Sequence, residues 1–176
     1  MTQDLTARQR RAQQVEAKYA ADLRRLRQAK EDELQELNER YKVLRRAYRQ
    51  ERVNIKEDFA LQRLGLKSKI ESLKNRRAVA RNTMSDLSAA EKRAVLEDFN
   101  NSINSLAEQL IKLERQEHAA LTDAEERFDN RCKDNQAERR AINKHYISEA
   151  EKLHEAYLQH VEQNRQERES EEGGVQ

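Results

Sequence analysis

The amino-acid sequence predicts an all-α protein, a long antiparallel two-helix coiled-coil hairpin, from three observations. The 176 residues include no proline, the residue that most often breaks a helix. Charged residues make up 39% of the chain and hydrophobic residues 36%, a balance typical of a coiled coil rather than of a domain with a large core. Apolar side chains recur every eleven residues, which is three turns of a nearly straight helix, so they form one stripe. These residues are Val15, Leu26, Leu37, Tyr48, Phe59 and Ile70.

The first helix is expected over about 6–82. Thr6 and Gln9 match a capping box, which marks a helix start. Gly65 is the one glycine inside the segment and costs roughly 1 kcal/mol relative to alanine. We interpret it as a site of close packing or slight bending.

A turn is expected at about 83–88, where the apolar pattern falters. Ser88 and Glu91 form a second capping-box match and predict that a new helix begins there. Neither glycine nor proline enforces the turn. One continuous long helix in an oligomeric coiled coil is therefore the alternative fold.

The second helix is expected over about 88–166, and it begins with heptad spacing. Its first apolar positions are Leu96, Phe99, Ile103, Leu106, Leu110 and Leu113. Residues 1–166 then form a single elongated helical hairpin, and residues 167–176 form a disordered tail. Arms of about 80 residues predict a rod roughly 120 Å long.

The position of the turn predicts how the two apolar stripes pair. The expected pairs include Tyr48 with Leu121, Ala12 with Tyr157, Leu37 with Cys132, and Arg52 with Glu117. Charge supports antiparallel pairing, because residues 1–30 are basic, with eight Lys/Arg and three Asp/Glu, whereas residues 151–176 are acidic, with three and seven. In the hairpin these two segments lie side by side.

No residue pattern predicts catalysis, a metal site or a cofactor, and we expect the protein not to be an enzyme. Glu151-x-x-His154 matches half of a di-iron helix-bundle motif, but the chain has no second copy. Cys132 is the only cysteine and has no histidine beside it in the sequence to activate it. We interpret it as a small residue that fills the seam.

The segment 61–95 around the turn is the candidate partner-binding region, because it carries nine Lys/Arg against three Asp/Glu and more apolar residues than one seam needs. The candidate residues at this hairpin tip are Leu61, Leu64, Arg76, Arg77, Val79, Arg81, Met84, Leu87, Lys92, Arg93 and Val95. One interpretation is a solvated tip whose spare apolar residues pack on a sister hairpin. Another is a docking surface for an acidic partner protein. Binding of nucleic acid is the third interpretation, although the segment has no interleaved aromatic residues for base stacking.

These patterns predict a non-enzymatic coiled-coil structural or adaptor protein that acts as a rod or spacer in a larger assembly, for example a virion or a secretion machine. The expected partners are proteins of that assembly and further copies of the chain. We expect a cytoplasmic location or one inside a virion, with no signal peptide and no membrane contact.

Two alternative functions remain open. The two-helix plan resembles that of the export-stalk proteins of flagellar and type III secretion ATPases, which are long antiparallel hairpins whose paired termini enter the ATPase ring. The resemblance covers the whole chain, carries no shared motif, and implies an export-stalk-like subunit. The other alternative is a nucleic-acid-binding protein that uses the basic tip.

Overall fold

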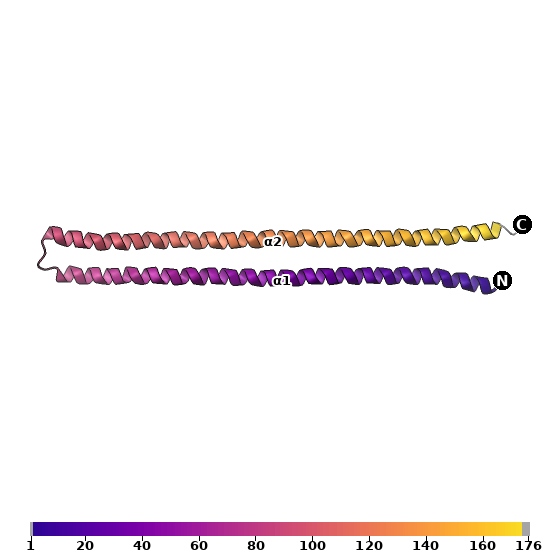
Figure 1. Ribbon diagram of the computed structural model, residues 1–176, viewed down its shortest axis with the longest axis horizontal. Coiled ribbons are helices and arrows are strands. Elements are labelled where there is room, and N and C mark those ends of the chain that lie inside the picture. The colour runs from indigo at the N-terminus through magenta and orange to yellow at the C-terminus, as the bar shows by residue number, and fades with distance from the viewer. Residues whose placement is uncertain (1, 174–176) are drawn as a thin grey trace. The chain divides into compact units, whose positions relative to one another are not determined.

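Two long helices make up the fold. A computed structural model describes residues 2–173, apart from the side chains of residues 2–6, 8 and 171–173. Helix α1 spans Thr2–Thr83 and helix α2 spans Ala89–Gly173, and no strand occurs among the described residues. The two helices pack against each other and are joined by a turn over residues 84–88 (Figure 1). The predicted all-α helical hairpin is confirmed, and one continuous helix is excluded.

Both helices extend further than the sequence predicts. α1 begins at Thr2 rather than near residue 6, and the side chain of the expected cap, Thr6, lies outside the described residues. α2 continues to Gly173, so the disordered tail expected over 167–176 is wrong for residues 167–173. Glutamate, arginine and glutamine dominate this segment and favour helix. Arg165 also pairs with Glu169 one turn ahead, at 3.1 Å. Residues 174–176 lie outside the described part.

Packing divides the chain into two units, and each unit contains a part of both helices. Unit 1 comprises Met1–Lys42 and Arg131–Gln176, so the first half of α1 packs on the last half of α2. Unit 2 comprises Val43–Asn130, which includes the turn. That residues 1–166 form a single elongated body stays a prediction.

Each unit has only a thin core. Among the described side chains, Leu37 and Tyr146 are buried in unit 1, and Leu113 and Ala124 are buried in unit 2. Two helices touch along one stripe each, so most other seam side chains keep one side in solvent. The fold therefore leaves many apolar side chains partly or largely exposed.

The pairing of the stripes differs from the prediction by one heptad. Tyr48 stacks on Phe128 in unit 2 with ring centroids 4.3 Å apart, whereas the expected partner was Leu121. Tyr19 stacks on Tyr157 in unit 1 at 4.5 Å, whereas Tyr157 was expected opposite Ala12. Both partners lie about seven residues, or two helical turns, from the predicted position.

Other contacts across the seam also differ from the predicted pairs. Glu117 forms an ion pair with Arg63 rather than with Arg52. The Arg52 guanidinium instead lies 5.7 Å from the centre of the Tyr48 ring. Cys132 Sγ lies 4.0 Å from the hydroxyl of Tyr41, which is one helical turn from the predicted neighbour Leu37.

The shift has two physical causes. The helices end at Thr83 and begin at Ala89, so the turn is centred on Asp86 rather than between residues 84 and 85. In addition, residues two helical turns apart point to the same side of a helix, so the apolar stripes of the two helices can face each other in more than one register. Aromatic stacking, which is worth about 1 kcal/mol beyond burial, favours the register that is found.

Candidate partner-binding surface

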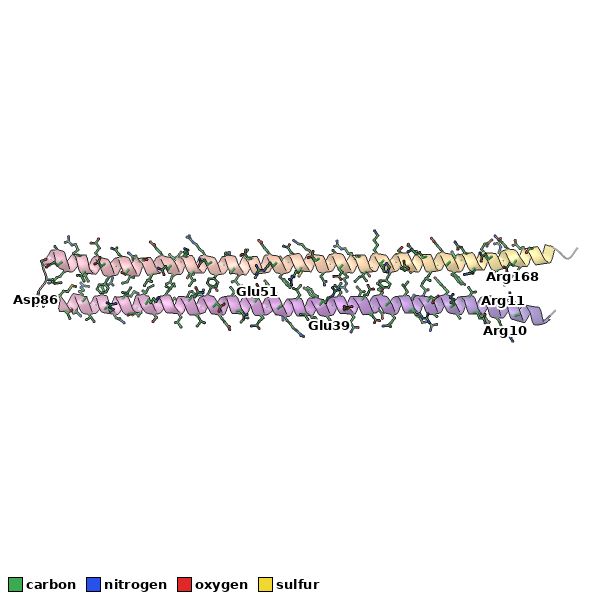
Figure 2. The ribbon with its side chains drawn as sticks, viewed as in Figure 1. Arg10, Arg11, Glu39, Glu51, Asp86 and Arg168 are labelled. Carbon is green, nitrogen blue, oxygen red and sulfur yellow. The ribbon has the colours of Figure 1, made fainter. Side chains whose placement is uncertain are left out.

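The turn is held by hydrogen bonds at the ends of both helices. At the end of α1, the Thr83 hydroxyl donates to the carbonyl of Val79 at 3.0 Å. At the start of α2, the Ser88 hydroxyl and backbone N–H donate to Glu91 Oε2 at 2.7 and 2.8 Å, and the Glu91 N–H donates back to Ser88 Oγ at 3.3 Å. This contact confirms the predicted capping box. Figure 2 shows Asp86 at the turn between the two helices.

The capping box also affects the charge of Glu91. The hydrogen bond from the Ser88 side chain, followed by the one from its backbone, holds the pKa of the Glu91 carboxyl below its usual value of 4.5. The negative charge lies in the first turn of α2, where the helix dipole favours it. The capping box at the start of α2 therefore carries a negative charge.

A basic groove lies on unit 2 beside the turn, with a volume of about 540 Å³. Its lining residues are Lys74, Arg77, Ala78, Arg81 and Asn82 of α1, with Leu96 and Asn100 of α2. No carboxylate lines the groove. Arg77 Nη1 donates to Asn100 Oδ1 at 2.5 Å, which holds this guanidinium in place across the two helices.

The predicted cations take different positions around the turn. Arg77 and Arg81 line the basic groove, whereas Arg76, Lys92 and Arg93 do not. Arg76 and Arg93 are exposed, and Lys92 Nζ donates to the carbonyl of Ser85 at 3.4 Å. Three cations near the turn, Lys74, Arg77 and Arg81, therefore share the groove, and Arg76, Lys92 and Arg93 lie outside it.

The predicted apolar residues divide into exposed and partly covered groups. Leu61, Leu64 and Val79 are 68%, 65% and 61% exposed, and Leu87 is exposed at the turn. Met84 and Val95 are half-buried. The side chains of the first group are therefore open to solvent and are not covered by the helix–helix seam.

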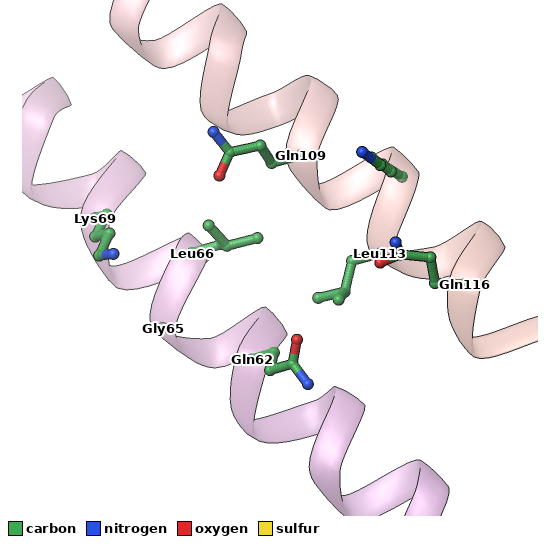
Figure 3. Close-up of a pocket in the computed structure, with 8 residues that line it drawn as sticks. Gln62, Gly65, Leu66, Lys69, Gln109, Leu113 and Gln116 are labelled. Atoms are coloured by element: carbon green, nitrogen blue, oxygen red, sulfur yellow. The ribbon is translucent and has the colours of Figure 1, made fainter. Parts of the chain in front are cut away.

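A second groove of about 400 Å³ surrounds Gly65 on unit 2 (Figure 3). Its lining residues are Gln62, Gly65, Leu66, Lys69, Gln109, Lys112, Leu113 and Gln116. A Cβ atom added to Gly65 would meet no other atom within 4 Å. The interpretation of Gly65 as a site of close packing inside the chain is therefore wrong.

Five residues that line the groove are missing from the predicted set, namely Lys74, Ala78, Asn82, Leu96 and Asn100. Lys74 could have been found from its spacing. It lies three residues before Arg77 and seven before Arg81, and residues at these spacings share one helical face. The two asparagines carry no charge signal. Asn100 also belongs to the other helix, so its place depends on the register.

Within the described residues, no group of three or more His, Cys, Asp or Glu side chains is arranged to hold a metal ion. The His154 of the Glu-x-x-His pattern instead lies with its Nδ1 3.1 Å from the Tyr19 hydroxyl. Neither described helix has an apolar stretch long enough to cross a membrane. Comparisons with protein-family models, with curated proteins and with solved structures gave no match.

Proposed function

We propose that this chain is a non-enzymatic coiled-coil structural or adaptor protein that acts as a rod or spacer in a larger assembly, such as a virion or a secretion machine. The observation that carries the proposal is the thin core, with only Leu37, Leu113, Ala124 and Tyr146 buried among the described side chains. Two helices that pack this sparsely offer most of their side chains to partners. Further copies of the chain and other proteins of the assembly are the proposed partners.

Two measurements test this proposal. Small-angle scattering of the full chain should give the profile of an elongated particle, and a compact globular profile would contradict the spacer role. The intact protein, purified from its native source, should also bring the same partner proteins with it in repeated preparations. A variant with Leu61→Ser and Leu64→Ser is the matched test of the exposed apolar surface, because these changes remove no buried contact. It should lose partners that pack there while keeping its helix content.

Nucleic-acid binding is the second candidate, and the basic groove favours it. Lys74, Arg77 and Arg81 surround the groove without a carboxylate, as a site for a phosphate backbone requires. This function predicts affinity for DNA or RNA that falls steeply with salt and is lost when Arg76, Arg77 and Arg81 become glutamate. The exposed cations Arg45 and Lys56, changed to glutamate, serve as the control. Absence of salt-sensitive binding would exclude it.

An export-stalk-like subunit is the remaining alternative, and it depends on paired helix ends. In unit 1 the first half of α1 packs on the last half of α2, which is the arrangement that such a stalk would present to an ATPase ring. A pull-down of the full chain with the cognate secretion ATPase tests this function directly. Failure to bind that ATPase would exclude the export-stalk function and would not contradict the spacer role.

A further inference from the structure

The basic groove has an apolar floor between two cations. Ala78 and Leu96 line it, with Lys74 four residues before Ala78 and Arg81 three residues after it. Neither Lys74 nor Arg81 takes part in an ion pair or hydrogen bond among the described residues. An acidic partner can therefore form salt bridges here without displacing an existing one.

An exposed acidic stripe with the matching spacing lies on α2 in unit 1. Leu158 is 51% exposed, with Glu155 three residues before it and Glu162 four residues after it. Residues at these spacings share one helical face. Glu155 has no ion-pair partner among the described residues, and Glu162 has two surface contacts, an ion pair with Arg165 at 3.8 Å and a hydrogen bond from Gln166 Nε2 at 3.3 Å. Such exposed pairs contribute little and exchange readily.

The two surfaces are complementary when the helices cross antiparallel. With Leu158 placed over Ala78 and Leu96, Glu155 comes opposite Arg81 and Glu162 comes opposite Lys74. The wider charges agree, because segment 61–95 is basic and segment 151–176 is acidic. None of these four charged side chains is needed for the core of its own unit, because all four lie outside the buried set.

We propose that the basic groove of one copy binds the acidic stripe around Leu158 of a second copy. This inference rests on the proposed structural function and names one of its partners. The contact joins two different surfaces, so it is heterologous, and a pair of copies keeps one free stripe on the first copy and one free groove on the second. Copies therefore add in series, in a ring or an open chain, and the contact weakens as salt screens the ion pairs.

Sedimentation velocity of the full chain over a range of protein and salt concentrations tests the proposal. The wild-type protein should form larger species as its concentration rises at low salt, and these should dissociate at high salt. Either charge-reversed variant, Lys74→Glu with Arg81→Glu or Glu155→Lys with Glu162→Lys, should self-associate at least about tenfold more weakly, the effect of losing two charge pairs. Arg45→Glu with Lys56→Glu, which changes the net charge equally outside the groove, should behave as wild type.

Mixing the two charge-reversed variants is the decisive step. Each reversed surface then meets a reversed partner, so the equimolar mixture should recover the association that each variant lacks alone. The proposal is overturned if the mixture stays dissociated while circular dichroism shows both variants folded, or if the wild type keeps one size at every concentration. It is also overturned if the groove variants lose only nucleic-acid binding. In each of these cases capture of other partner proteins would still support the structural function.

Discussion

Tyr48 of α1 stacks on Phe128 of α2 with the ring planes inclined by only 6° and the centroids 4.3 Å apart. The two rings can stack only when the helices are aligned along their axes in one register, so this pair specifies the register of unit 2. The stack of Tyr19 on Tyr157 does the same in unit 1. The two pairs mark the same one-heptad displacement from the register that the turn alone predicts.

The first prediction concerns the energy of this stack. Phe128→Ala should lower the free energy of unfolding by about 2 kcal/mol, less than for a fully buried ring because Phe128 is half-buried. Urea denaturation followed by circular dichroism measures the change. Ile111→Ala, at an exposed position of the same unit, is the control and should stay within about 0.5 kcal/mol of wild type. Equal losses in both variants would contradict the role of the stack.

The second prediction tests the register through ion pairs. Single and double alanine variants of Arg63 and Glu117 should show a coupling energy of about 1 kcal/mol, because both side chains are mostly covered. The same cycle with Arg52 and Glu117 should show almost none. Urea denaturation of the four proteins of each cycle gives both values. Coupling of Glu117 to Arg52 instead would support the register predicted from the sequence.

The sequence was sufficient for the helices and the turn, because periodicity and capping are local properties. Ser88 and Glu91 are three residues apart, and their contact depends on nothing distant. The register could not be chosen from the stripes, since Leu121 and Phe128 lie two turns apart on the same face of α2. The spacing of the aromatic residues did hold the signal, because one shift aligns both Tyr19 with Tyr157 and Tyr48 with Phe128.

The candidate site was predictable only in part for the same reason. Arg77 and Arg81 stood out as charges near the turn. Asn100 completes the groove from the second helix, and its contact with Arg77 exists only in the observed register. A charge count finds the cations of such a groove, and packing decides which neutral residues join them.

The third prediction concerns acid sensitivity at the turn. The pKa of Glu91 is lowered in the folded state, so its carboxylate stabilises the fold fully above about pH 4.5, and this contribution is lost as the pH falls through the folded pKa. Glu91→Gln should therefore lower the melting temperature at pH 7, and its difference from wild type should shrink below pH 4.5. Ser88→Ala, which removes the other half of the cap, should cost about 1 kcal/mol. A difference that stays constant with pH would contradict the charged cap.

The fourth prediction concerns alkaline behaviour in unit 1. The Tyr146 hydroxyl donates to Glu33 Oε1 at 2.9 Å, and burial, followed by this hydrogen bond and the charge of Glu33, raises the pKa of Tyr146 above 10.0. The raised pKa stabilises the fold fully below pH 10.0, and that contribution is lost as the pH rises through the folded value. In an ultraviolet titration of tyrosinate, Tyr146→Phe should remove a component that titrates above the ordinary range. Glu33→Gln should move that component toward pH 10.0, and an unchanged position would contradict the contact.

The last prediction concerns Gly65. This glycine lies inside α1, and an added Cβ would meet no atom within 4 Å, so alanine is free to replace it. Gly65→Ala should raise the free energy of unfolding by about 1 kcal/mol, because alanine loses less backbone entropy in a helix. Ala60→Gly, at an exposed position of the same helix, should lower it by a similar amount. Urea denaturation at low protein concentration measures both. If Gly65→Ala destabilises the protein and the loss grows with concentration, another molecule must approach the backbone at Gly65, and the groove around it would be an interface.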